Sequence, residues 1–278
     1  MGPVTYRTYH QVTGEDRSRA GVQVKAQHDR VTERLEAVRR VVAVMSGKGG
    51  VGKSYVTSWL ARAAAATVRV GVLDADLRSP TVARLLGAKG PLRVAESGVE
   101  PSIAADGIAV FSTDLLLDEG QPLRWRSSVG APFVWRGVLE AGALREFLSD
   151  VAWGSLDLLL VDLPPGGDCV TDLYQLVPSL AGILAVTIPS DEAQHSVARS
   201  LRAAQGSDTP ILGVIENMSG YRCPGCAGVQ PLFAGAAGQT LADEFAVPLL
   251  ARLPFRPLGD GPGPEALAPA IRAVLGKA

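Results

Sequence analysis

The feature that most constrains the fold is a glycine-rich turn between an apolar segment and a segment of helical character. Residues 47–54 read Gly-Lys-Gly-Gly-Val-Gly-Lys-Ser and satisfy the pattern G-x-x-x-x-G-K-[S/T]. Residues 41–46 before the turn are apolar and β-rich, and a helix is expected from residue 54 to about residue 66. Glycines let successive N–H groups converge, and the following helix N-terminus adds positive potential. The turn therefore predicts a site for the phosphates of ATP.

Two side chains of the turn are expected to bind different parts of the magnesium–nucleotide complex. Lys53 would neutralise the β- and γ-phosphates, and the Ser54 hydroxyl would be a ligand of Mg²⁺. The backbone of the whole turn would surround the phosphates. The nucleotide-binding residues expected here are Gly47, Lys48, Gly49, Gly50, Val51, Gly52, Lys53 and Ser54, followed by Tyr55.

The rest of the chain alternates between apolar and helical segments. Strands are expected at 41–46, 69–74, 107–112, 155–162, 181–188, 210–216 and 247–253, and further helices at 137–149, 190–205 and 236–246. Continuous apolar strands separated by helices are typical of a parallel sheet that is covered on both faces. We therefore expect an α/β fold of the P-loop NTPase type, with a doubly wound, mostly parallel sheet in a single domain. Residues 87–106, rich in Gly, Pro and Ala, are expected to be a surface excursion or a mobile loop.

The N-terminal part of the chain differs from the rest. Residues 1–20 are polar and unpatterned and are expected to be a loose tail. Residues 21–40 predict an amphipathic helix that packs on the main domain, because Val31, Leu35 and Val38 recur at helical spacing. The ATPase domain is then expected to span residues 41–278.

Composition excludes several functional classes. With 47% hydrophobic and 20% charged residues the chain can form a substantial core, and its net charge of −1 argues against a general nucleic-acid binder. The sequence contains no signal-peptide pattern and no run of 18 apolar residues, so we expect a cytoplasmic protein that does not bind membranes. Three cysteines in such a chain point to metal or redox chemistry rather than to structural disulfides.

Three carboxylates follow predicted strands and should lie beside the turn. Asp74 ends the predicted strand at 69–74 and Asp76 follows it, while Asp162 ends another predicted strand. Ligands of doubly wound sheets bind beyond the carboxyl ends of the strands. We assign Asp162 to holding Mg²⁺, Asp76 to orienting the attacking water, and Asp74 to supporting the metal as a nearby acid.

A cysteine pair, Cys223 and Cys226, follows the predicted strand at 210–216. Two thiolates at this spacing can share one metal centre. A redox dithiol and a purely structural pair have the same pattern, so the spacing leaves these alternatives open. Two ligands make only half of a four-ligand site, and a symmetric dimer would supply the other half.

Taken together, the motifs resemble one family. In chain order they are the phosphate turn, Asp74-Ala75-Asp76, Trp135-Arg136-Gly137, Asp162-Leu163-Pro164-Pro165-Gly166, Glu216-Asn217-Met218-Ser219 and Cys223-Pro224-Gly225-Cys226. This order over roughly residues 40–255 resembles the Mrp (ApbC-like) iron–sulfur carriers. That family belongs to the deviant Walker A P-loop ATPases, together with MinD and the nitrogenase iron protein.

The resemblance implies a function and further site residues. Lys48 resembles the signature lysine that reaches across a nucleotide-sandwich homodimer to the partner's phosphates, and would take part in catalysis with Lys53 and Asp76. Cys223 and Cys226 from each of two subunits would hold a [4Fe–4S] cluster, which passes to apo iron–sulfur proteins. Asn217 matches a residue that contacts adenine in relatives.

The sequence also departs from the family pattern. Tyr55 replaces the usual threonine after the turn, and Ser79 replaces a glycine before Pro80. The loop at 164–168 is one residue shorter than usual. These changes predict slow hydrolysis of ATP rather than loss of ATP binding.

Two alternatives remain open at this stage. The first is a positioning ATPase of the MinD or ParA type, whose ATP dimer binds a membrane or DNA. The second is a nucleotide-gated dimer in which zinc at Cys223 and Cys226 joins the two subunits.

Overall fold

The computed structural model describes residues 20–116, 136–166, 168–256 and 261–276. All but the last residue of the expected tail at 1–20 lie outside this part, as does Trp135 of the motif at 135–137. The helices are α2 (Ala20–Leu35), α3 (Lys53–Ala65), α4 (Val82–Leu86), α5 (Arg136–Asp150), α6 (Asp168–Leu176), α7 (Asp191–Gln205), α8 (Ala237–Glu244) and α9 (Pro264–Leu275), with one 3-10 turn at Thr113–Leu115. The strands are β1 (Val41–Ser46), β2 (Val70–Asp74), β3 (Arg93–Ala95), β4 (Gly98–Glu100), β5 (Ser102–Ile103), β6 (Ala109–Phe111), β7 (Leu158–Asp162), β8 (Gly182–Thr187), β9 (Ile211–Arg222), β10 (Val229–Gln230) and β11 (Leu249–Phe255).

The main sheet is mostly parallel and has the order β10-β9-β8-β1-β7-β2-β6-β5, with β11 also paired to β9. Among the strands that the structure describes, only β10 and β5 run antiparallel to their neighbours in this sheet. Strand β1 lies between β7 and β8, so the residues that follow it emerge near the middle of the carboxyl edge of the sheet. This confirms the expected doubly wound α/β fold, and it places the phosphate turn where such sheets bind ligands.

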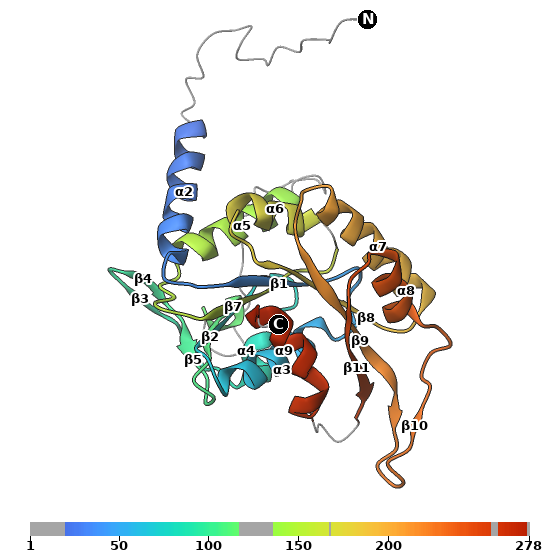
Figure 1. Cartoon of the computed structure of the whole chain (residues 1–278). Coiled ribbons are helices and arrows are strands. Elements are labelled where there is room, and N and C mark those ends of the chain that lie inside the picture. Colours follow the sequence, from blue (N-terminus) through green and yellow to red (C-terminus); the bar gives the residue numbers. More distant parts are fainter. Residues whose placement is uncertain (1–19, 117–135, 167, 257–260, 277–278) are drawn as a thin grey trace, which may run out of the picture.

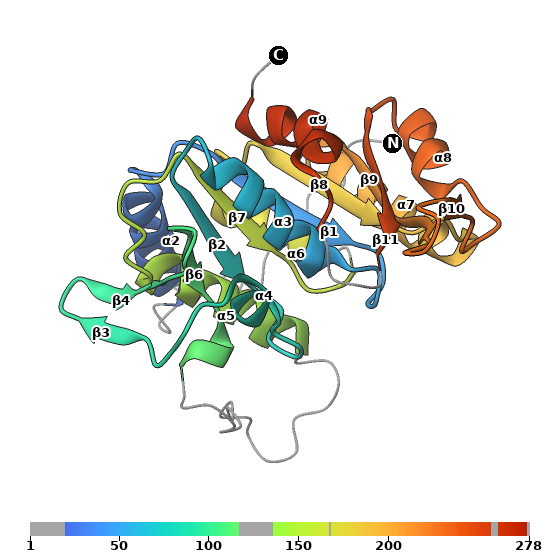
Figure 2. The same ribbon diagram turned by 90° about the horizontal axis from the view of Figure 1, so that it is seen from below.

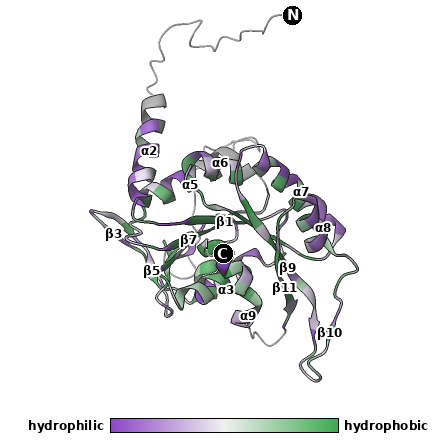
Figure 3. Cartoon of the chain, viewed as in Figure 1, coloured by the Kyte–Doolittle hydropathy of each residue, from purple (hydrophilic) through white to green (hydrophobic). Residues whose placement is uncertain are grey.

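Helices cover both faces of the sheet (Figure 1). Helices α2, α5, α6, α7 and α8 lie on one face, and α3, α4 and α9 lie on the other, as Figure 2 shows from below. Strand β1 serves both cores, because Ala43 and Met45 pack toward the first layer while Val42 and Val44 pack toward the second. Figure 3 shows the corresponding hydropathy, with apolar central strands and hydrophilic outer surfaces on α7 and α8. Strands buried on both faces explain the continuous apolar segments of the sequence.

The N-terminal helix packs on the first layer. Helix α2 contacts α5, and it buries Val31 and Leu35 as the helical spacing predicted. The helix ends at Leu35, earlier than the expected residue 40, and Val38 forms an isolated bridge with Leu156 instead. No described helix is long and apolar enough to cross a membrane.

Three segments differ from the expectation. Residues 87–106 contain the small hairpin β3–β4 and the edge strand β5, whose few apolar residues gave no periodic signal. Strand β9 continues to Arg222, six residues beyond its predicted end, because β10 and β11 pair with its last part. Helices α4, α6 and α9 were not predicted; α9 carries Pro269 inside it, which disguises the helical pattern.

Candidate nucleotide site and cysteine hairpin

The phosphate turn is shaped by close packing on α7. A Cβ on Gly47 would come within 2.4 Å of the backbone of Ser196 and Val197, so only glycine fits there. The Ser196 hydroxyl donates a hydrogen bond to the Gly47 carbonyl at 2.5 Å. Gly50 and Gly52 have φ values of 81°, in the left-handed region that favours glycine. No side chain caps the N-terminus of α3, so its first N–H groups remain available to an anion.

Behind the turn, three donors surround one buried carboxylate. Asp162 has no exposed surface, and its Oδ2 accepts hydrogen bonds from Lys53 Nζ and from the Ser54 hydroxyl, both at 2.6 Å. The Thr57 hydroxyl, also fully buried, donates to Asp162 Oδ1 at 2.6 Å. The structure therefore brings Lys53, Ser54 and Asp162 together as the sequence suggested. Thr57 was missed, although it lies one helical turn after Lys53 on the same face of α3.

The hydroxyl of Ser54 and the carboxylate of Asp162 fit a magnesium ion. Mg²⁺ is bound through oxygen atoms, commonly one or two carboxylates together with substrate phosphates. Here a hydroxyl oxygen and a carboxylate oxygen are adjacent at the N-terminus of α3, where phosphates would bind. When bound, the metal would neutralise charge that develops on the phosphates.

Asp74 lies beside Asp162 because β2 and β7 are parallel neighbours with these two residues in register. Asp74 is 1% exposed, and its Oδ2 accepts hydrogen bonds from the backbone N–H groups of Thr81 and Val82 and from the Ser112 hydroxyl. Burial, and then the charge of Asp162, raise the pKa of Asp74 to about 7. Asp74 therefore holds the loop before α4 as well as lying near the expected metal position.

Asp76 lies in that loop, farther from the turn. Its Oδ1 accepts hydrogen bonds from the backbone N–H groups of Arg78 and Ser79, at 3.1 and 3.2 Å. The side chain is half-buried, and the phosphate turn provides none of these donors. Asp76 thus orders its own loop, and its assignment to the attacking water stays a prediction.

Lys48 lies at the surface near the N-terminus of α7. The pKa of Glu192 lies below its usual range, first because of hydrogen bonds at that helix end and then because Lys48 and His195 are close. The side chain of Lys48 is half-exposed. Lys48 is thus partly exposed and lies close to Glu192 at the start of α7.

Tyr55 faces an aromatic neighbour. Its ring meets Trp59 edge-on, with 6.3 Å between the ring centroids. Burial raises the pKa of the Tyr55 hydroxyl, while a hydrogen bond with Trp59 and the charge of Arg256 oppose this. The phenol is therefore held in place beside the first turn of α3.

Asn217, expected at the adenine, is tied directly to the phosphate turn. Its side chain is 5% exposed, and Nδ2 donates to the Val51 carbonyl at 2.9 Å. A Cβ on Gly52 would lie 2.3 Å from the same nitrogen. The side chain thus packs against the turn, a contact that the sequence did not reveal.

The cysteine pair lies at the tip of the hairpin formed by β9 and β10 (Figure 1). The Cys223 N–H donates to the Gly228 carbonyl, and the Ala227 N–H donates to the Cys223 carbonyl, which closes the turn. Cys226 is exposed and Cys223 is half-buried. Hydrogen bonds from the backbone N–H of Cys226, then that of Gly225, and from the Cys226 side chain lower the pKa of Cys223. The pair is therefore accessible and suited to binding a metal as thiolate.

The cysteine site is incomplete within one chain. Among the described residues, no group of three or more His, Cys, Asp or Glu side chains is placed to hold a metal ion. Cys169 lies elsewhere, in the first turn of α6, where it is half-buried and packs against the core. Exposed apolar side chains flank the hairpin, namely Val229, Leu232, Phe233 and Phe255. The hairpin therefore offers two thiols and an apolar surround.

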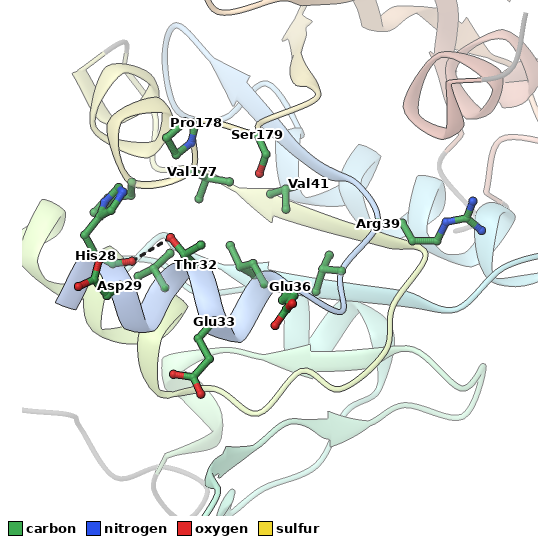
Figure 4. Close-up of a pocket in the computed structure, with 14 residues that line it drawn as sticks. His28, Asp29, Thr32, Glu33, Glu36, Arg39, Val41, Val177, Pro178 and Ser179 are labelled. Carbon is green, nitrogen blue, oxygen red and sulfur yellow. Dashed lines mark hydrogen bonds between the residues drawn. The ribbon is translucent and has the colours of Figure 1, made fainter. Parts of the chain in front are cut away.

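A separate cavity of about 800 Å³ lies between α2 and the connection from α6 to β8 (Figure 4). Its lining includes His28, Glu36 and Arg39 on one side and Val177 and Pro178 on the other. It reaches the start of β1, whereas the phosphate turn follows the end of that strand. None of the residues assigned to the nucleotide, the metal or the cysteine pair lines this cavity.

Comparisons with known proteins identify the family of the chain. Residues 37–260 match the family model described as ParA: NUBPL iron-transfer P-loop NTPase. An iron-sulfur cluster carrier protein of Saccharolobus solfataricus is 40% identical over 245 residues, which cover 87% of this chain and 80% of that protein. The cytosolic Fe-S cluster assembly factor NUBP1 homolog of Brugia malayi is 38% identical over 235 residues, covering 81% of this chain and 73% of that protein.

Solved structures are also similar. A nucleotide-binding protein from Archaeoglobus fulgidus, in complex with ADP, has a TM-score of 0.67 and 32% identity, and the match covers 90% of this chain and 94% of that one. The cell division ATPase MinD of Pyrococcus furiosus has a TM-score of 0.55 at 20% identity, covering 85% and 98%. The second likeness concerns the fold alone.

Proposed function

The chain belongs to the NUBPL iron-transfer family of ParA-type P-loop NTPases, and on this premise we propose that it carries iron–sulfur clusters to apo-proteins. The observation that carries the proposal is the accessible pair Cys223 and Cys226 at a hairpin tip, in a chain whose phosphate turn is intact. Relatives are named iron-sulfur cluster carrier proteins. The cargo that fits two cysteine thiolates per subunit is a [4Fe–4S] cluster with four thiolate ligands.

The proposed working form is a homodimer. Four thiolates require two chains, and a two-fold axis beside the hairpins would bring the two pairs together. The apolar side chains of Val229, Leu232, Phe233 and Phe255 next to the hairpin support this, because contact between subunits would remove them from water. The partly exposed position of Lys48 is consistent with its reaching a partner's nucleotide.

The nucleotide is proposed to be ATP, with hydrolysis at a low rate. Gly47 to Ser54 and Tyr55 would surround the phosphates, and Ser54 and Asp162, with Asp74 nearby, would hold Mg²⁺. Lys48, Lys53 and Asp76 would act in hydrolysis, and Asn217 would contact the adenine. We propose slow turnover because Asp76 is engaged by its own loop and Tyr55 replaces a small hydroxyl residue.

We also propose that the protein works in the cytoplasm. Two relatives, from Brugia malayi and Yarrowia lipolytica, are named cytosolic Fe-S cluster assembly factors. The accessible, unpaired state of Cys223 and Cys226 suits a reducing compartment.

Anaerobic reconstitution with iron and sulfide tests the cargo. The parent protein should develop broad visible absorbance and bind about four irons per dimer. Cys223→Ala should abolish both signals, while the matched variant Cys169→Ala should keep them, because Cys169 packs against the core away from the hairpin. A colourless parent, or iron binding that survives loss of both Cys223 and Cys226, contradicts the proposal. Zinc instead of iron in anaerobically purified protein would also contradict it.

A further inference from the structure

One strand, β9, connects the phosphate turn with the cysteine hairpin. Asn217 lies in β9 and contacts the turn, and Cys223 follows the end of the same strand six residues later. At most about 20 Å of extended chain separates the two positions. The two sites therefore share a short, continuous length of backbone.

The contact at the turn fixes the orientation of one peptide group. Asn217 Nδ2 donates to the Val51 carbonyl, and the peptide between Val51 and Gly52 is planar and trans. Holding the carbonyl therefore also sets the direction of the Gly52 N–H, which points to the opposite side. Asn217 also packs closely on Gly52, since a Cβ at Gly52 would lie 2.3 Å from Asn217 Nδ2. A phosphate that draws the N–H groups of the turn inward must act on Asn217 as well.

The next residue, Met218, gives β9 an unusual shape. Its φ is 52°, in the left-handed region that side chains other than glycine rarely adopt. The pairing with β11 is irregular here, since Leu253 pairs with Asn217 but Phe255 pairs with Tyr221. Four residues of β9 thus span the length of two in β11, which is a bulge. The bulge lies between the phosphate turn and the hairpin and sets the direction in which the hairpin leaves the sheet.

We propose that Asn217 and Met218 transmit the state of the phosphate turn to the cysteine pair. A bound nucleotide reorients the peptide at Val51, Asn217 follows, and the bulge at Met218 changes the position of the hairpin. The exposure and reactivity of Cys223 and Cys226 then depend on the nucleotide. By linkage, occupation of the cysteine pair changes nucleotide affinity by the same factor. This inference rests on the proposed function, because it describes how the nucleotide regulates the cluster site.

Thiol labelling of the metal-free protein tests the coupling directly. In a Cys169→Ala background, the maleimide labelling rates of Cys223 and Cys226 are measured by peptide mapping without nucleotide and with saturating ADP or ATP. Nucleotide should change the rate by at least about fivefold, the lower end of typical coupling between two sites. Met218→Gly should reduce the ratio of the labelling rates with and without nucleotide to below about twofold, because glycine adopts the positive φ freely and loosens the bulge. Asn217→Ala should do the same by removing the contact with Val51.

The matched control is Asp208→Gly, which replaces a residue with a φ of 54° in the loop after α7. It should keep the parent ratio. A fluorescent nucleotide analogue verifies that each variant binds nucleotide. If Asn217→Ala no longer binds it, the test of the coupling depends on Met218→Gly alone. A parent ratio near one with nucleotide bound, or an unchanged ratio in Met218→Gly, overturns the coupling. The labelling experiment needs no cluster, so it separates the two proposals. If reconstitution fails but labelling still depends on the nucleotide, the proposed cargo is rejected and the coupling stands.

Discussion

Replacing Thr57 by valine tests how the proposed metal carboxylate is held. The Thr57 hydroxyl donates to Asp162 Oδ1 at 2.6 Å, and both side chains are fully buried. Valine keeps the approximate shape but leaves that carboxylate oxygen without this donor. A hydrogen bond to a charged group contributes about 1.5–3 kcal/mol. We therefore expect the free energy of unfolding to fall by about 2 kcal/mol, roughly a 30-fold change in the ratio of folded to unfolded protein.

Urea unfolding of the nucleotide-free protein, followed by circular dichroism, measures this loss. Thr57→Ser is the matched control, because it keeps the hydroxyl and loses only a buried methyl group, for about 1 kcal/mol. A second readout separates positioning from stability. In Thr57→Val, the Mg²⁺ concentration that supports half-maximal nucleotide affinity should rise about 10- to 100-fold, as when other hydrogen-bond partners of metal ligands are removed. In Thr57→Ser this concentration should stay near the parent value. Parent-like magnesium dependence in Thr57→Val would refute the reasoning.

Three further predictions follow from burial and packing. The pKa of Asp74 is raised from 3.8 to about 7 by burial and by Asp162, so its contribution to stability is present below about pH 4 and is lost as the pH rises through 7. Asp74→Asn should flatten the stability of the nucleotide-free protein across this interval, as measured by denaturant titration. Gly47→Ala should abolish nucleotide binding in a fluorescence titration because its Cβ would meet the backbone of α7, whereas Gly49→Ala, with no atom within 4 Å, should fit without a clash. The pKa of Cys223 is lowered by N–H donors of the hairpin turn, so its alkylation should reach half-maximal rate at a lower pH than that of an unperturbed thiol.

Local patterns were sufficient for the centre of the fold. The turn at 47–54 is a continuous stretch whose residue types have a direct steric and electrostatic meaning, and it lies between β1 and α3 as expected. Asp74 and Asp162 were predicted to converge because parallel strands end at one edge of a sheet, and their register in β2 and β7 confirms this. In these cases the sequence carries the constraint within a few residues.

Contacts between distant segments were not predictable in the same way. The bond from Asn217 to Val51 joins residues 166 positions apart, and no periodicity describes such a pair. Thr57 is a different case. Its hydroxyl lies on the buried face of α3, where a polar group needs a hydrogen-bond partner. A helical projection of α3 would therefore have indicated an acceptor on the neighbouring strand. The bulge at Met218 depends on the pairing of β9 with β11, which is set by tertiary structure.

The ion pair between Lys53 and Asp162 also constrains how nucleotide and metal can bind. Lys53 and Asp162 form a buried ion pair at 2.6 Å, yet Lys53 is expected to face phosphate and Asp162 to face magnesium. Breaking a buried pair is costly when either charge is left alone. Phosphate by itself would compensate Lys53 and leave Asp162 unpaired, while magnesium by itself would do the reverse. Only the two together satisfy both charges, so the magnesium–nucleotide complex should bind as one unit, and chelating the metal should weaken nucleotide binding even though Lys53 and the turn are unchanged.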